Sequence, residues 1–166
     1  MVSTHAGETG FAEEYDCENI LIRNIYPESL IWQDENGVEQ KEYCYRAFAI
    51  YSFNNRQNKN VTIDGIYGTS KCAPRVVCDG KADTPHLINV EIKNIDIEVK
   101  DIVVNNTYEK TALTLRYVRA DKFILDNVNL TYSGNNQMYA VFNEYVTIKN
   151  LQINDCSFKN LAGNSP

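Results

Sequence analysis

The absences in this sequence exclude several classes of protein. It contains no run of about 18 apolar residues, the length needed for a membrane-spanning helix, so no membrane insertion is expected. Residues 1–10 are polar and lack the apolar centre of a secretory signal peptide. No cluster of Lys and Arg is present and the net charge is −6. A nucleic-acid partner is therefore not expected, because such proteins normally carry a basic patch.

Cysteine and histidine do not occur in patterns that indicate a metal site. The five cysteines are odd in number and include no CxxC spacing, so no structural zinc site is expected. They are interpreted as small buried residues. The two histidines, His5 and His86, lie near no Ser or Cys motif, which disfavours a nucleophile–base pair. The sequence therefore predicts no metal and no cofactor.

The overall composition is that of one folded domain. The chain has 166 residues, of which 43% are hydrophobic and 23% charged, so it is too apolar to be disordered. The acidic balance also disfavours a polyanionic ligand, unless metal ions bridge the two.

One short pattern recurs five times. The copies begin at Ile20, Val61, Val90, Phe123 and Val146, so their starts are 41, 29, 33 and 23 residues apart. In each copy apolar residues alternate at period two, which predicts a strand. The fifth residue is Asn or Gly, which tolerate positive φ: Asn24, Gly65, Asn94, Asn127 and Asn150. Each copy therefore predicts a strand, a sharp bend and a second strand.

A third apolar run precedes most copies, at residues 47–51, 75–78, 112–115 and 139–142. Three strands per coil with Asn at one bend resemble the pectin-lyase-like right-handed parallel β-helix superfamily, which includes phage tailspikes and polysaccharide-processing proteins. The resemblance covers roughly residues 11–160. It implies an all-β, right-handed parallel β-helix of about five coils with an Asn/Gly bend ladder. No capping helix is evident, so we expect residues 1–166 to be one segment of a longer β-helix or to be capped by a partner.

Stacking of such coils makes equivalent residues form columns. The inward column is expected to contain Ile63, Ile92, Leu125 and Ile148. The Asn column is expected to form a ladder of side-chain amide hydrogen bonds. The residues before it alternate in charge, which would fix the register of the coils: Arg23, Asp64, Lys93, Asp126 and Lys149.

The longest insertion, residues 27–45, is predicted to be a projecting β-hairpin. Asn36-Gly37 lies between residues 30–35 and 38–40 and indicates a type I′ turn. The arm carries the only tryptophan, Trp32, a candidate platform for a sugar ring. The alternative is that Trp32 folds back to cover the flank of the β-helix.

Other candidate residues come from the remaining coils. Sugar-stacking or hydrogen-bonding roles are expected for Trp32, Tyr51, Arg75, Arg116 and Tyr117. If chemistry occurs, the candidate acid–base residues are Asp79, Asp121 and Glu144, because carboxylates on neighbouring coils would lie near the separations that glycosidases use. The alternative for each carboxylate is a place on a solvated acidic surface.

Two functions remain open at this stage. The first is a carbohydrate-binding or polysaccharide-processing β-helix, acting as a glycoside hydrolase or polysaccharide lyase if it is an enzyme. The N-T-D, D-D, G-H-G and R-x-K segments of polygalacturonase-like hydrolases and the R-x-P-x-x-R pattern of pectate lyases are missing, which disfavours those two activities. The second is a non-catalytic structural or adhesive module of a phage tail or surface fibre. Either implies an extracellular or virion-surface location and a homo-oligomer, expected to be a trimer.

Overall fold

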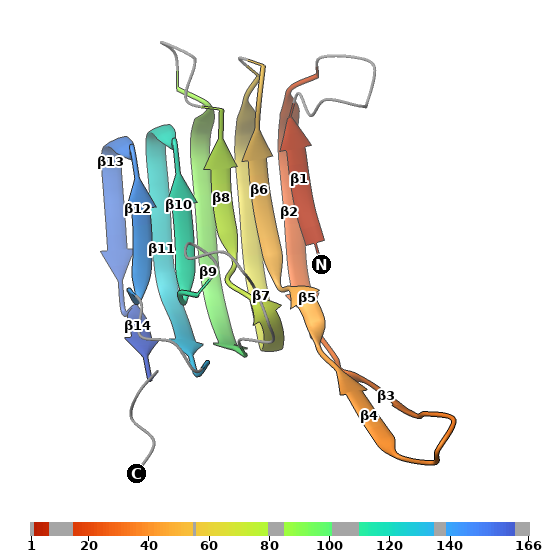
Figure 1. The fold of residues 1–166 in the computed structure, drawn as a ribbon. Coiled ribbons are helices and arrows are strands. Elements are labelled where there is room, and N and C mark those ends of the chain that lie inside the picture. Colours follow the sequence, from red (N-terminus) through yellow and green to blue (C-terminus); the bar gives the residue numbers. More distant parts are fainter. Residues whose placement is uncertain are drawn as a thin grey trace.

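Every regular element in the described part of the chain is a β-strand. The computed structural model describes residues 2–6, 15–54, 56–79, 85–100, 110–134 and 139–161. Within these ranges no helix is long and apolar enough to cross a membrane. The strands wind into a parallel β-solenoid of about three turns (Figure 1). They are β1 (Val2–Ala6), β2 (Cys17–Ile25), β3 (Leu30–Gln33), β4 (Glu39–Glu42), β5 (Cys44–Arg46), β6 (Phe48–Ser52), β7 (Asn58–Cys72), β8 (Arg75–Cys78), β9 (Leu87–Val99), β10 (Leu113–Arg116), β11 (Arg119–Tyr132), β12 (Val141–Glu144), β13 (Thr147–Asn154) and β14 (Ser157–Asn160).

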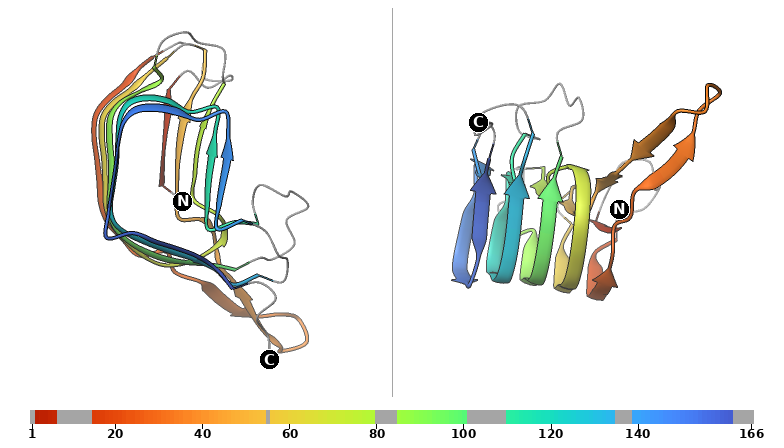
Figure 2. Two further views of the ribbon diagram at one scale, coloured as in Figure 1. Left: turned by 90° about the vertical axis from the view of Figure 1, so that its left-hand side faces the viewer. Right: turned by 90° about the horizontal axis from the view of Figure 1, so that it is seen from below.

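Two parallel sheets form the walls of the solenoid. The five-stranded sheet has the order β1-β6-β8-β10-β12. The seven-stranded sheet has the order β13-β11-β9-β7-β2, and β5 and β14 pair with its members. Seen along the axis, the long strands of the seven-stranded sheet bend around two sides, and the five-stranded sheet stands opposite (Figure 2). The prediction of an all-β fold with parallel stacked strands is confirmed.

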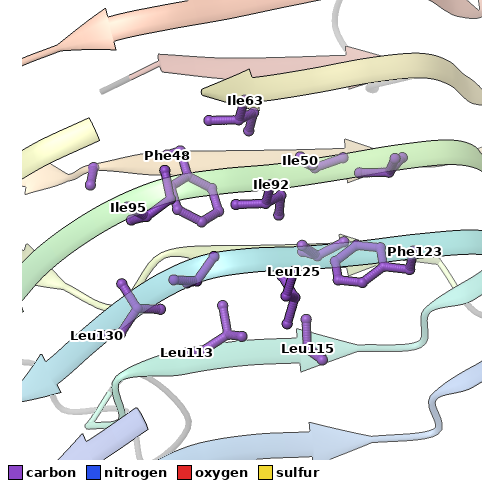
Figure 3. Packing of buried hydrophobic residues seen from close by; sticks show 14 of the residues in the cluster. Phe48, Ile50, Ile63, Ile92, Ile95, Leu113, Leu115, Phe123, Leu125 and Leu130 are labelled. Carbon is purple, nitrogen blue, oxygen red and sulfur yellow. The ribbon is translucent and has the colours of Figure 1, made fainter. Parts of the chain in front are cut away.

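Alternating apolar residues build one continuous core between the sheets. Ile22, Ile63, Ile92 and Leu125 are paired in register across four strands. Ile63 and Ile92 are fully buried and Leu125 is nearly so. Phe48, Ile50, Leu113 and Leu115 of the five-stranded sheet face them across the interior (Figure 3).

The fifth copy of the repeat was aligned incorrectly from the sequence. Ile148 lies opposite Ala120, and Ile153, not Ile148, lies opposite Leu125. Lys149 likewise leaves the alternating-charge column, in which Asn154 stands beside Asp126. The true fifth copy is Leu151–Phe158, which has Asp155 in place of Asn or Gly at the bend and starts 28 residues after Phe123.

Strand pairing shows that the fifth copy begins at Leu151 and not at Val146. Leu113 pairs with Val141 in one sheet, and Phe123 with Leu151 and Leu130 with Phe158 in the other. All three pairs are 28 residues apart, so the last two layers contain no insertion between them. The expected spacing of 23 would have required a deletion at the corner between β12 and β13.

Positive-φ residues mark the bends. Asn24, Gly65, Asn94 and Asn127 have φ between 52° and 79°, and Asp155, with φ 48°, takes the equivalent place in the last layer. Along this column Asn127 donates to Asn94 Oδ1 (3.0 Å), but Asn94 donates to Asp64 (2.8 Å). Asn150 lies outside the column and donates to the carbonyl of Asp121. In this column the chain of side-chain hydrogen bonds therefore passes from Asn94 to a carboxylate and does not run from amide to amide throughout.

A second asparagine column lies one bend earlier and was not anticipated. Asn19, Asn60 and Asn89 have φ of 56°, 51° and 56°. Asn60 donates to Asn19 Oδ1 (3.1 Å) and Asn89 donates to Asn60 Oδ1 (3.0 Å). This pair of bonds ties β2, β7 and β9 together at one edge of the bend.

The insertion after β2 forms an antiparallel hairpin, β3–β4, that points away from the strand stack (Figure 1). Its turn differs from the predicted type I′, because only Gly37 has positive φ (75°). Gly37 N–H donates to the carbonyl of Asp34, so a four-residue turn ends at a glycine in the left-handed region. The Asp34 carboxylate accepts hydrogen bonds from Asn36, Val38 and Gln40 and fixes this turn.

Candidate functional site

The outer face of the five-stranded sheet gathers several of the residues that the sequence analysis selected. Tyr51, Val77, Arg116 and Glu144 are paired in one row across β6, β8, β10 and β12. Ile50, Val76 and Leu115, which precede Tyr51, Val77 and Arg116, belong to the hydrophobic core. Since side chains alternate along a strand, this row faces outward.

Arg116 and Glu144 form the charged centre of the row. Arg116 Nε donates to Glu144 Oε2 (2.7 Å), and the Tyr117 hydroxyl donates to Glu144 Oε1 (3.1 Å). The guanidinium of Arg116 also lies over the Tyr117 ring, 5.2 Å from its centroid. The hydrogen bond from Arg116 holds the pKa of Glu144 below its usual value. Glu144 is therefore a fixed, ionised hydrogen-bond acceptor.

Two tyrosines stack where the chain turns from one sheet to the other. Tyr117 follows β10 and Tyr145 follows β12, and their rings lie 5.5 Å apart with an interplanar angle of 9°. Both have positive φ, 54° and 51°, which is rare for aromatic residues. Tyr145 is 78% exposed, so the pair presents a ring face to solvent.

Two neighbouring hollows extend from this tyrosine pair. One of about 400 Å³ is lined by Tyr117, Arg119, Tyr145, Val146 and Thr147. The other, of about 230 Å³, is lined by Pro85, Arg119, Ala120, Thr147 and Lys149. Because Arg119 and Thr147 line both, the two hollows adjoin and form one shallow depression along the corner.

Tyr51 and Arg75 form a second aromatic–cation cluster on the same face. Arg75 Nε donates to the Tyr51 hydroxyl (2.5 Å), and its guanidinium lies 4.8 Å from the Tyr51 ring centroid. Phe53 stacks on Tyr51 with a centroid distance of 6.0 Å. Tyr51 itself is buried, however, so this cluster offers less ring surface to a ligand than Tyr145 does.

Asp79 occupies a separate, more buried environment. One carboxylate oxygen accepts the backbone N–H of Asn54 (2.7 Å) and the other lies 3.1 Å from His86 Nε2. Burial lowers the pKa of His86; Asp79 opposes this shift and Arg119 adds to it. His86 Nδ1 is buried and has no hydrogen-bond partner among the described residues. The pair thus joins a neutral imidazole to a carboxylate inside the structure.

Asp121 and Trp32 lie away from the tyrosine pair. Asp121 is on β11 and is bound by Lys149 Nζ (2.6 Å). Trp32 is on β3, is 42% exposed and pairs across the hairpin with Gln40. In Figure 1 the hairpin leaves the lower side of the stack near the β1–β2 layer, whereas the carboxyl ends of β10 and β12 lie at the upper side in layers nearer β13. Trp32 and Tyr117 therefore do not contribute to one surface.

The contacts of the three candidate carboxylates fall into three separate sets. Asp79 contacts His86, Asp121 contacts Lys149, and Glu144 contacts Arg116. A general acid needs a raised pKa, whereas that of Glu144 is lowered. Among the described residues no group of three His, Cys, Asp or Glu could hold a metal ion. The arrangement at Tyr117 and Tyr145 is suited to binding by stacking and hydrogen bonds.

Sequence reasoning missed Tyr145, Arg119 and the His86–Asp79 pair. A signal for Tyr145 was available, because the spacing of 28 residues between the last two layers places it directly beside Tyr117. Arg119 was not among the selected site residues, and His86 was considered only as a possible partner of a Ser or Cys nucleophile. Their neighbours come from other layers, so no local pattern could identify them.

We compared the chain with protein families, curated proteins and solved structures. The chain matches no family model, no curated protein and no solved structure.

Proposed function

We propose that this chain is a carbohydrate-binding β-solenoid module that holds a glycan against the Tyr117–Tyr145 pair. The observation that carries the proposal is the exposed, stacked pair of rings beside the Arg116–Glu144 ion pair. Tyrosine offers an apolar ring to the C–H face of a sugar and a hydroxyl to its polar edge. Arg116, Arg119 and Glu144 supply donors and an acceptor for sugar hydroxyls.

The shape of the face supports a polymeric ligand. The aromatic cluster at Tyr51 and the pair at Tyr145 lie three strands apart in the sheet, which corresponds to roughly 14 Å. This separation exceeds the width of one sugar ring. A chain of sugars along the solenoid axis would contact both clusters, with the strongest stacking at Tyr145.

Binding without cleavage is the form of the proposal that the side-chain contacts support. Each of Asp79, Asp121 and Glu144 is engaged by a cationic or imidazole partner of its own. Hydrolysis by paired carboxylates needs a general acid with a raised pKa, whereas Glu144, the carboxylate beside the tyrosine pair, has a lowered pKa because Arg116 donates to it. We therefore propose no glycoside hydrolase or lyase activity.

The finer architecture also belongs to this proposal. We propose a right-handed winding with five coils, as in the pectin-lyase-like superfamily that the sequence resembles. The parallel pairing of β2, β7, β9, β11 and β13 and the recurring positive-φ bends support it. A glycan-binding solenoid of this kind would act outside the cell or on a virion surface. The homotrimer expected from the sequence is the closed state that competes with an open stack of molecules.

The alternative is a non-catalytic structural or adhesive module of a phage tail or surface fibre. The observation that favours it is the apolar hollow of about 500 Å³ at the β13 end of the core, which would suit continued stacking. A purely structural module would bind no glycan.

A glycan-array screen followed by titration calorimetry tests the proposal. Tyr145→Ala should weaken binding of any glycan found by tenfold or more, because it removes the exposed stacking ring. The matched control is Tyr26→Ala, since Tyr26 is also exposed and stacks on Tyr67 at 5.8 Å, but lies elsewhere. Equal loss in both variants would show that the site is misplaced. Absence of any bound glycan would favour the structural alternative.

A further inference from the structure

The β13 end of the solenoid exposes apolar core residues. A hollow of about 500 Å³ is lined mainly by such side chains, among them Phe123, Leu125, Leu151, Ile153 and Phe158. Leu151 and Ile153 are 50% and 53% exposed although their columns are buried further inside. Among the described residues, β13 is the last strand of its sheet and no strand pairs with its outer edge.

The two outer edges of the seven-stranded sheet carry the same inward columns. One column starts at Ile20 on β2 and runs through Val61, Val90 and Phe123 to Leu151 on β13. The next starts at Ile22 and ends at Ile153 in the same way. If β2 of a second molecule continued the ladder beyond β13, Ile20 would lie on Leu151 and Ile22 on Ile153. Both exposed β13 side chains would then be covered by apolar ones.

The charged column at the edge is complementary in the same register. Within one molecule Lys59 binds Asp16 (2.7 Å) and Glu18 (2.9 Å) of the neighbouring β2 layer. Lys149 holds the corresponding place on β13, because Ile148 and Asn150 on either side of it pair with Ala120 and Lys122. A second molecule would bring its own Asp16 and Glu18 beside Lys149. The lysine–carboxylate arrangement would therefore recur across the boundary.

The bends also match. Asn24 on the β2 side has φ 57°, and Asp155 on the β13 side has φ 48°. In the stacked arrangement these two residues would be neighbours in one column, and the Asn24 amide would donate to the Asp155 carboxylate. Arg23 would stand beside the uncharged Asn154, so no like charges would meet.

We propose that this surface binds a second copy of the chain, with β2 of one molecule added in parallel to β13 of the next. Such an interface uses two different surfaces, so it does not close on itself and generates a growing stack. The paired edge is Cys17–Ile25 of β2, whereas the hairpin begins at Leu30 and projects past this end of the stack at one corner (Figure 1), so the second molecule would lie alongside it. The proposal needs no glycan, but the second molecule would lie beside the glycan site, because Thr147 and Lys149 of β13 line the depression at the tyrosine pair.

Sedimentation velocity over a wide concentration range tests it. The wild-type chain should show a mass that rises in multiples of 19.0 kDa with concentration and does not stop at a dimer or trimer. Ile153→Lys should raise the concentration needed for association at least tenfold, because it places a charge in the apolar hollow. Gln152→Lys is the matched control, since it adds the same charge on the opposite face of the same strand. A wild-type chain that stays monomeric, or a closed trimer indifferent to Ile153→Lys, overturns the proposal.

A second pair of variants tests the register and preserves the fold. Asn24→Asp keeps a residue type that tolerates positive φ but places a carboxylate beside Asp155 of the next molecule. Association should weaken severalfold, and adding Asp155→Asn in the same chain should restore it. If the single and double variants associate equally, the two edges do not meet in this register. Thermal unfolding of each variant confirms that the monomer remains folded.

Discussion

Tyr117 and Tyr145 adopt a backbone conformation that ordinarily favours Asn or Gly. Their φ values of 54° and 51° carry a cost of about 1–3 kcal/mol each for a bulky residue. The corners at Asn24, Asn94 and Asn127 show which residue type a purely structural bend selects here. Two tyrosines at such corners, with rings stacked at 5.5 Å, therefore indicate that the rings are kept for what they contact.

Core packing can be tested at a single residue. Ile92 is fully buried, between Ile63 and Leu125 in its column. Ile92→Ala should lower the free energy of unfolding by about 2–5 kcal/mol, because stacked strands cannot collapse into the void. Glu91→Ala on the same strand should change it by less than about 0.5 kcal/mol. Urea denaturation measures both, and a loss below about 1 kcal/mol for Ile92→Ala would contradict the inward assignment.

The buried His86 predicts a pH dependence of stability. Its pKa is lowered below the ordinary 6.5, mainly by burial. The unfolded chain therefore binds more protons than the folded chain as the pH falls below 6.5, and stability decreases with falling pH in that range. Asp64 and Glu98 have pKa values lowered from 3.8 and 4.5, so they act only in more acidic solution.

Denaturation at about pH 7 and about pH 5.5 provides the measurement. The wild-type chain should be less stable at the lower pH, and His86→Gln should remove this difference by removing the titrating group. If both proteins lose the same stability between the two pH values, another group is responsible.

At the scale of elements, the hairpin β3–β4 is expected to be energetically separate from the solenoid. Its side chains are largely exposed, and its turn depends on the three hydrogen bonds that Asp34 accepts. These bonds hold the pKa of Asp34 below its usual value. Asp34→Ala should speed amide hydrogen exchange throughout residues 30–42 while leaving the melting temperature of the solenoid within about 1–2 °C. A large fall in that temperature would show that the hairpin is coupled to the core.

The elements also show where reasoning from the sequence reaches its limit. Alternation and the Asn or Gly bend identified β2, β7, β9 and β11 with the correct residues facing inward. The last copy failed because Val146–Ile153 has Asn at the fifth position, whereas Leu151–Phe158 has the same apolar alternation but Asp155 at the bend. The pairing of β11 with β13 and β14, and of β10 with β12, decides between them, and these pairings are not visible in the repeat.

At the scale of the whole molecule, the sequence also could not show which candidate site residues lie on one surface. Arg116, Tyr117 and Glu144 were selected as candidates, and their side chains lie together. Trp32 was expected beside them. It lies on β3 of the hairpin, which projects away from the strand stack (Figure 1). Which residues share a surface depends on the offset between layers, and this offset changes from 41 to 29, 33 and 28 along the chain. A local pattern cannot supply it.

These unequal offsets have a consequence for how such a chain evolves. Coiled coils must keep their heptads, so a single inserted residue disturbs the whole seam. Here the connections differ in length from layer to layer, and one contains an entire hairpin, while Ile22, Ile63, Ile92 and Leu125 are aligned in one column. Mutation can thus lengthen one corner without any compensating change in the next. Descendants of one ancestral solenoid would then share a core geometry long after their repeats had ceased to align.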